Sequence, residues 1–140
     1  MDIEEVNAYF EGIFEEIDTQ TSLFLIAATE ATVRSDFLER VYTRKRDAVS
    51  QTFREVYKTR CNHNKVKVRL EEDILDVWGN HLPKTKPDVS RLKGALKYRN
   101  WLAHGRYWVP KIGQRYDPIG IIQIATNFLE KTKQDQPITS

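Results

Sequence analysis

The chain has 140 residues and a net charge of +2, with 40% apolar and 30% charged side chains. This length and composition predict one globular domain with a continuous core and exclude a disordered chain. No apolar run approaches the about 20 residues of a membrane-spanning helix, so we expect no membrane partner. The chain begins with acidic residues instead of a basic secretory leader, and Cys61 is its single cysteine. We therefore expect a cytoplasmic location.

The charges fall into alternating blocks along the chain. Residues 1–40 carry −8, residues 41–70 carry +7, residues 71–83 carry −4, residues 84–115 carry +8, and residues 116–140 carry −1. Basic blocks between acidic ones favour a focused positive surface despite the near-neutral total, although they are also typical of solvated helix faces. In the second basic block the charge accompanies several Tyr and Trp residues. This combination favours a polyanionic partner such as nucleic acid.

Apolar residues recur at helical spacing from the beginning of the chain. The stripe over residues 3–17 predicts a first helix, which the polar run 18–22 ends. Ser22 is then a suitable N-cap for a second helix over residues 23–41. The basic cluster 43–46 is either a turn or part of one long helix.

The middle of the chain predicts two further helices. Asp47 opens an apolar phase that continues to Tyr57, and residues 60–64 form a break. The next helix covers residues 70–78 and stops at Gly79 and Asn80.

A Lys-rich loop between Pro83 and Pro87 precedes the helix over residues 92–103, and Asp88 or Ser90 is its expected N-cap.

The last part of the chain leaves two interpretations open. The β-branched residues of 119–124 fit a strand, but the apolar spacing over 122–129 also fits a final helix, which we prefer. We therefore predict an all-α bundle of five or six helices in one domain, residues 1–134, followed by a polar tail, residues 135–140.

One Arg and one His stand out at the end of the helix over residues 92–103. Arg99 lies on the apolar phase of this helix, where a charge is costly unless an anion meets it. His104 follows five residues later, and Gly105 suits the position after a helix end. A guanidinium and an imidazole near one helix end form a candidate phosphate site.

The segment Arg99–Gly105 resembles the R-x4-6-H signature of the HEPN superfamily. Arg99 and His104 match the two motif residues, Asn100 matches the polar residue that commonly follows the Arg, and residues 101–103 supply the apolar filler. The resemblance implies an all-α bundle that acts as a homodimer, with two motif helices forming one composite cleft. It also implies a metal-independent endoribonuclease that uses no cofactor.

The residue types fit this chemistry. RNA cleavage by the 2′-hydroxyl needs proton transfer and a cation that stabilises the charged phosphorane. An imidazole, with an unperturbed pKa of about 6.5, suits proton transfer, which we assign to His104. A guanidinium suits stabilisation of the phosphorane, which we assign to Arg99. Asn100 can orient the imidazole or bind the phosphate. The expected RNA-binding residues are Lys93, Lys97, Trp101, Arg106, Tyr107, Trp108 and Lys111.

The family further implies a role in toxin–antitoxin or anti-phage defence, with a cognate antitoxin or nucleotidyltransferase as partner. Toxins that such a transferase modifies often carry Tyr two residues after the His. Arg106 stands there in this chain, and Tyr107 follows it.

Other interpretations stay open at this point. The chain is alternatively a non-catalytic HEPN module that binds RNA or nucleotides, or a helical adaptor for protein partners. A purely structural role would pair Arg99 with an acidic neighbour and use His104 as a helix cap. No metal signature is present, and Glu11, Glu15 and Glu16 are best interpreted as the solvated face of the first helix.

Overall fold

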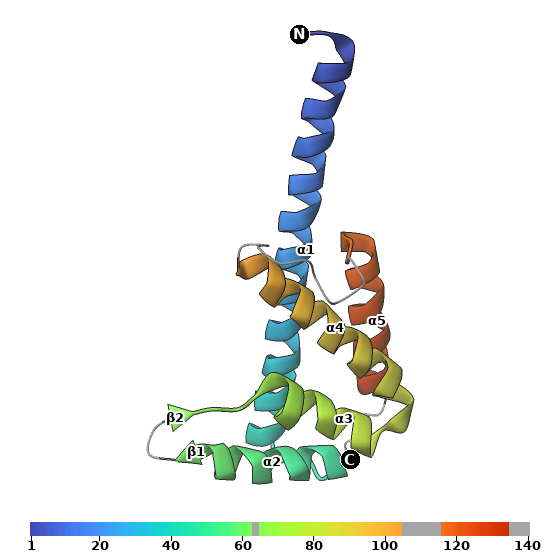
Figure 1. Cartoon of the computed structure of the whole chain (residues 1–140). Helices are drawn as coiled ribbons and strands as arrows, with labels where there is room; N and C mark the ends of the chain where they lie inside the picture. Colours follow the sequence, from blue (N-terminus) through green and yellow to red (C-terminus); the bar gives the residue numbers. More distant parts are fainter. Residues whose placement is uncertain (63–64, 105–115, 135–140) are drawn as a thin grey trace.

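The computed structural model describes residues 1–62, 65–104 and 116–134, and this part of the chain is a helical bundle (Figure 1). The predicted all-α class is confirmed. None of the described helices combines the length and the apolar composition that a membrane span requires. The α-helices are α1 (Ile3–Tyr42), α2 (Ala48–Arg60), α3 (Asp76–His81), α4 (Lys86–Ala103) and α5 (Pro118–Gln134).

Short elements connect these helices. β1 (Cys61–Asn62) and β2 (Lys65–Val66) form a two-residue antiparallel ladder after α2. A π-helical turn, η1 (Leu70–Leu75), leads directly into α3, and a 3₁₀ turn, η2 (Pro83–Thr85), leads into α4. The predicted tail, residues 135–140, lies outside the described residues.

The prediction of two helices over residues 3–41 is wrong, because α1 runs without a break from Ile3 to Tyr42. The polar run 18–22 contains no Gly or Pro, and each of its hydroxyl groups has a carbonyl acceptor. Thr21 donates to the carbonyl oxygen of Ile17 at 2.8 Å, four residues back. Ser22 is buried and donates to the carbonyl oxygen of Tyr116 at 3.1 Å, so it tethers α1 to the segment before α5 instead of capping a helix.

After α1 the basic cluster 43–46 is a turn, and Arg44 takes a positive φ of 52° there. Asp47 opens α2 as predicted. Its carboxylate accepts a hydrogen bond from the backbone N–H of Ser50 at 3.1 Å, which is the bonding pattern of an N-cap.

Aromatic residues from four helices hold the core together. Phe37 of α1 packs edge-on against Phe53 of α2, with ring centroids 4.8 Å apart. Phe53 contacts Trp78 of α3 at 5.8 Å, and Trp78 contacts Phe128 of α5 at 6.3 Å. All four side chains are buried, so this row of rings joins the helices across the centre of the bundle.

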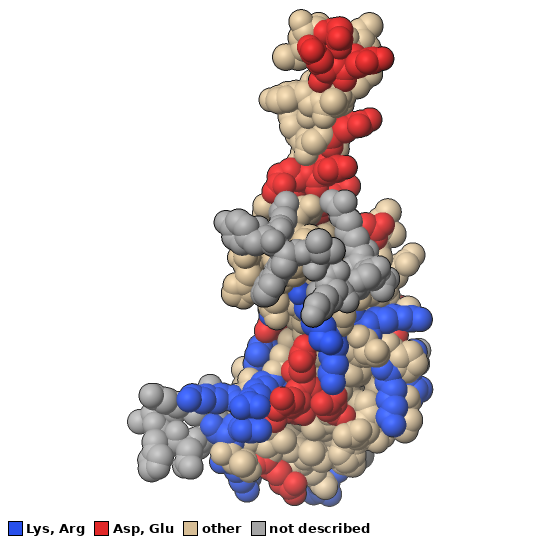
Figure 2. All heavy atoms as spheres, viewed as in Figure 1, with Lys and Arg blue, Asp and Glu red and all other residues tan. Residues whose placement is uncertain are grey.

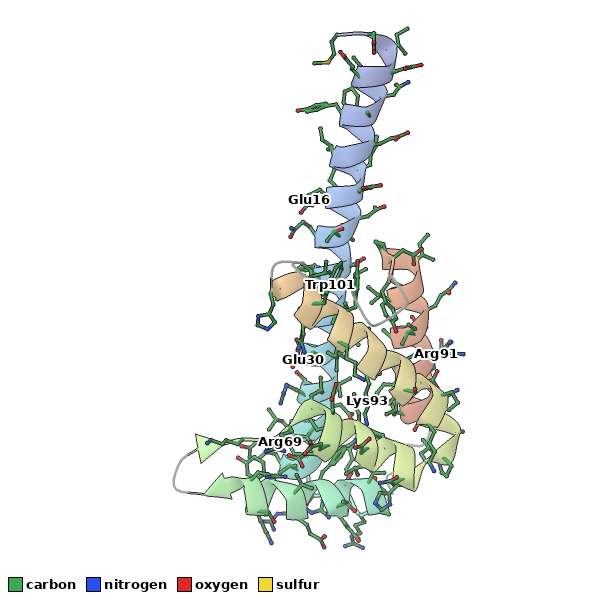
Figure 3. All side chains as sticks on the ribbon, in the orientation of Figure 1. Glu16, Glu30, Arg69, Arg91, Lys93 and Trp101 are labelled. Atoms are coloured by element: carbon green, nitrogen blue, oxygen red, sulfur yellow. The ribbon has the colours of Figure 1, made fainter. Side chains whose placement is uncertain are left out.

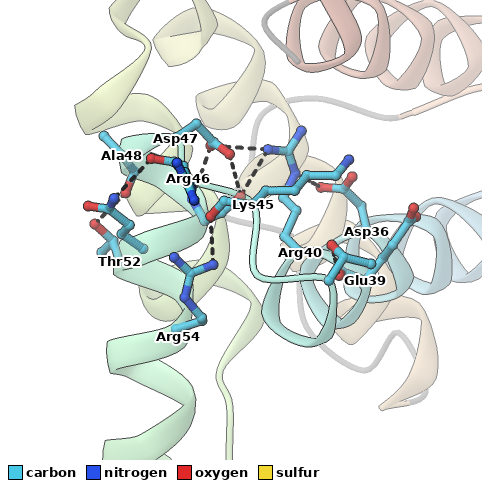
Figure 4. A network of polar contacts seen from close by, with 12 residues as sticks. Asp36, Glu39, Arg40, Lys45, Arg46, Asp47, Ala48, Thr52 and Arg54 are labelled. Carbon is cyan, nitrogen blue, oxygen red and sulfur yellow. Dashed lines mark hydrogen bonds and ion pairs between the residues drawn. The ribbon is translucent and has the colours of Figure 1, made fainter. Parts of the chain in front are cut away.

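A buried arginine stabilises the junction of α1 and α2 (Figure 4). Arg40 is 1% exposed and contacts Asp36 at 2.9 Å and Asp47 at 3.2 Å. Its guanidinium carbon also lies 4.6 Å from the ring centroid of Trp78. Two carboxylates and an aromatic face together offset the cost of removing this cation from water.

The N-terminal end of α4 differs from the prediction. The helix begins at Lys86, so neither Asp88 nor Ser90 is its N-cap. Pro87 fits the first turn because an N–H at that position would have no partner within the helix. Asp88 is buried inside the helix, and its carboxylate contacts the ammonium group of Lys131 at 2.6 Å. This ion pair joins α4 to α5, whose helical interpretation is confirmed.

Candidate functional site at the C-terminal end of α4

Helix α4 places the motif residues at its last two turns. Leu92, Leu96 and Leu102 are buried and fix the rotation of the helix against the bundle. Arg99 follows Leu92 by seven residues and Leu96 by three, so its side chain leaves the helix close to this apolar stripe. Arg99 is consequently only partly exposed.

Glu30 of α1 is the partner of Arg99. Its carboxylate forms an ion pair and a hydrogen bond with Nη1 of the guanidinium. The Arg99 side chain remains 28% exposed and that of Glu30 23% exposed. Figure 3 labels Glu30 on α1 and Trp101 near the end of α4. The anion that an Arg on an apolar stripe requires is therefore supplied by α1.

Asn100 is exposed and lies beside Arg99. Its amide oxygen accepts a hydrogen bond from Nη2 of Arg99 at 3.4 Å. The guanidinium is thus oriented on one side by Glu30 and on the other by Asn100.

His104 is the C-cap residue of α4 and is exposed. Its backbone N–H donates to the carbonyl oxygen of Asn100 at 3.1 Å, which closes the last turn of the helix. This backbone bond fixes the main chain of His104 and leaves its imidazole outside the helix ladder. Gly105, expected just beyond the helix end, lies outside the described residues.

The residues expected to bind RNA differ in their surroundings. Lys97 is exposed on α4. Lys93 contacts Asp76 of α3 at 2.5 Å, so its ammonium group already has an anionic partner. Trp101 is partly buried and its ring lies 5.9 Å from that of Tyr98. The remaining predicted residues lie outside the described residues: Arg106, Tyr107, Trp108 and Lys111.

A tight contact holds the opposite side of α4. A Cβ added at Gly94 would lie only 2.1 Å from the hydroxyl of Tyr116, so the Tyr116 side chain would have to shift to accommodate it. Tyr116 also packs against Tyr98, with ring centroids 5.6 Å apart, and burial raises the pKa of its hydroxyl. Together with the bond from Ser22, these contacts fix Tyr116, two residues before α5 begins.

No group of three potential metal ligands lies together among the described residues. Glu11, Glu15 and Glu16 are exposed on α1. His81 lies at the end of α3, where its Nε2 is 3.1 Å from the hydroxyl of Thr52.

Sequence reasoning missed the role of Glu30. The signal was present, because Glu30 lies on the apolar phase of α1 between Ile26 and Val33, as Arg99 does on α4. Two opposite charges that each interrupt an apolar stripe are natural partners.

No protein-family model, curated protein or solved structure matches the chain. A functional proposal therefore rests on the residues at the end of α4 and on their resemblance to the HEPN motif.

Proposed function

We propose that the protein is a metal-independent endoribonuclease of the HEPN type, with Arg99, Asn100 and His104 as its catalytic residues. The supporting observation is the arrangement at the end of α4. An oriented, partly exposed guanidinium and an exposed histidine at the helix end occupy the two motif positions.

Each residue has a distinct role in this proposal. Arg99 binds the scissile phosphate and stabilises the negative charge of the phosphorane. A guanidinium has five N–H donors, more than the contacts with Glu30 and Asn100 use, so pairing with Glu30 is compatible with phosphate binding. Asn100 keeps the guanidinium in place.

His104 transfers protons. Attack by the 2′-hydroxyl requires a base, and departure of the 5′-oxygen requires an acid. A single imidazole serves both steps poorly, so a second copy of the chain would supply the other His104 across a composite cleft. The products would carry 2′,3′-cyclic phosphate and 5′-hydroxyl ends.

The test is incubation of labelled RNA with the purified protein in EDTA. We expect wild type to cleave and His104→Ala to be slower by about 10²- to 10⁴-fold, the usual contribution of acid–base catalysis. His81→Ala is the matched control, because His81 is also exposed at a helix end. Equal cleavage by wild type and His104→Ala would contradict the assignment of His104.

A second candidate function is RNA binding without cleavage. The ion pair between Arg99 and Glu30 favours it, since a carboxylate beside the guanidinium partly offsets the positive charge that cleavage needs to stabilise the phosphorane. Intact RNA with every variant, together with binding that weakens steeply as salt rises, would support this module and overturn the nuclease.

A further inference from the structure

Helix α1 has two apolar faces, and the described bundle covers only one of them. The covered face begins at Thr19 and includes Ile26, Val33 and Phe37, all of which are buried. Residues 3–18, which we call the N-terminal arm, contain no buried residue. In Figure 1 this arm extends beyond the rest of the molecule. A helix that is apolar on both sides is expected between two layers of protein.

The second apolar face follows a heptad spacing of alternating three and four residues. Ile3 is 79% exposed, Ile17 is 53% exposed and Phe24 is 73% exposed. Such a seam over three or more heptads is typical of a helix that pairs with another helix. Its positions, which we call the α1 seam, are Ile3, Val6, Phe10, Ile13, Ile17, Gln20, Phe24 and Ala27.

The charges of the arm lie away from the α1 seam. At 100° per residue, Glu4, Glu11, Glu15 and Asp18 project about 90° or more from the centre of the seam. The positions that flank the seam include Asn7, Tyr9, Phe14 and Thr21, and the carboxylates next to its edge are Asp2 and Glu16. Flanking charges set which partner helix is chosen, and a foreign partner is normally selected by complementary charges at these positions. Their scarcity points to a second copy of the same chain.

The charge distribution also selects the orientation. Residues 1–18 carry seven acidic and no basic side chains, whereas the remaining residues carry a net charge of +9. Figure 2 shows Asp and Glu on the arm and Lys and Arg gathered over the lower part of the molecule. Parallel pairing would place two acidic arms side by side. Antiparallel pairing sets residues 2–11 of each arm against residues 19–28 of the other copy, which carry no charge, so most of the like charges stay apart.

We propose that two copies of the chain pair antiparallel through the α1 seam, each arm lying along α1 of the other copy. The first, third, fifth and seventh residues of the α1 seam are heptad positions a, and the others are positions d. In an antiparallel pair each position a faces a position d of the other helix. This register sets Ile13 against Ile17, Val6 against Phe24, and Ile3 against the small Ala27. The proposed interface consists of α1 residues only, and the inference does not depend on the ribonuclease proposal.

Sedimentation velocity of the full-length protein over a concentration series tests the pairing. We expect a dimer for wild type and a rise in the dimer Kd of at least about 100-fold for Ile13→Glu with Ile17→Glu, because each substitution buries a charge. Ala8→Glu is the matched control, since Ala8 is exposed on the opposite side of the arm. Circular dichroism of all variants checks that α1 stays helical.

Disulfide trapping tests the orientation in a Cys61→Ser background. Mixing a chain carrying Ile3→Cys with one carrying Ala27→Cys should give a cross-linked heterodimer, whereas neither variant should cross-link to itself. Self-linking through Ile3→Cys would show a parallel pair and overturn the proposed orientation.

A wild-type monomer at all concentrations, or a dimer that Ile13→Glu with Ile17→Glu leaves intact, would overturn the α1 seam as the interface. A dimer without RNA cleavage would leave this inference standing and count against the nuclease alone.

Discussion

Two arginines, Arg40 and Arg99, interrupt apolar stripes of this bundle, and their surroundings differ. Arg40 is 1% exposed and contacts two carboxylates and the face of Trp78. Arg99 pairs with one carboxylate, that of Glu30, and remains 28% exposed. In both cases a carboxylate offsets the cost of placing a cation near the core, but Arg40 is enclosed on all sides whereas Arg99 is partly exposed to solvent.

The two arginines differ in whether a ligand from solution can reach the guanidinium. An enclosed guanidinium contributes to stability through its partners and is inaccessible to a ligand. A guanidinium that is oriented and still exposed is placed to bind an anion from solution. Mutations of the two residues distinguish a role in stability from a role in ligand binding.

Replacing each arginine by Met should have unequal effects on stability. Arg40→Met leaves Asp36 and Asp47 without their cation and should lower the free energy of unfolding by about 3 kcal/mol. Arg99→Met removes a partly exposed ion pair and should cost about 1 kcal/mol or less. Urea unfolding followed by circular dichroism measures both values. Equal losses would show that Arg99 is as structural as Arg40.

The Arg40 network should also depend on pH through Asp47. Burial raises the pKa of Asp47, but hydrogen bonds from Ser50 and the charge of Arg40 together lower it by more. The pKa of Asp47 therefore lies below the ordinary value of 3.8. A carboxyl group with a lowered pKa stabilises the folded protein when the pH is above the ordinary pKa. This stabilisation is lost as the pH falls through the pKa of the folded state. Asp47→Asn should therefore cost about 2 kcal/mol at pH 7 and progressively less below about pH 4.

Asp36 is the control for this measurement, because its pKa shifts the other way. Burial raises the pKa of Asp36 more than Arg40 lowers it, so ionisation of Asp36 lowers stability as pH rises through the folded-state pKa. Asp36→Asn should cost less than Asp47→Asn at pH 7. Unfolding at pH 7 and pH 3 gives the comparison, and a loss for Asp47→Asn that is independent of pH would contradict the assigned role.

Local patterns predicted most of the fold. Apolar spacing was enough for α2, α4 and α5, and Asp47 opens α2 as its residue type suggests. The predicted break in α1 failed because a run of Thr and Ser resembles a helix end, whereas their hydroxyls bond to carbonyls within α1 or to Tyr116. The cap at Asp88 failed because α4 already begins at Lys86, and the Asp88 carboxylate binds Lys131, 43 residues away, instead of capping the helix. Contacts distant in sequence decide such cases.

The candidate site was also predictable only in part, because some of its contacts join residues that are distant in sequence. The motif places Arg99 and His104 on one helix end, which spacing alone establishes. The identity of the carboxylate that meets Arg99 depends on how α1 crosses α4, and helical periodicity does not contain that information. The Gly94 contact with Tyr116 likewise depends on tertiary packing.

Glu30→Gln should have the smallest effects of these substitutions. It should lower the stability of the protein slightly and strengthen RNA binding by Arg99. The substitution removes two partly exposed ion pairs, with Arg99 and with Arg34 at 3.3 Å, and should lower stability by about 1 kcal/mol. The guanidinium is then released from a competing carboxylate, so RNA should bind about fivefold more tightly at low salt. Glu72→Gln is the matched control, since Glu72 pairs with Arg69 at 2.8 Å on an exposed surface and should change neither quantity. Weaker RNA binding by Glu30→Gln would mean that Glu30 orients Arg99 for the phosphate instead of competing with it, and Arg99 would then resemble Arg40 in depending on its carboxylate.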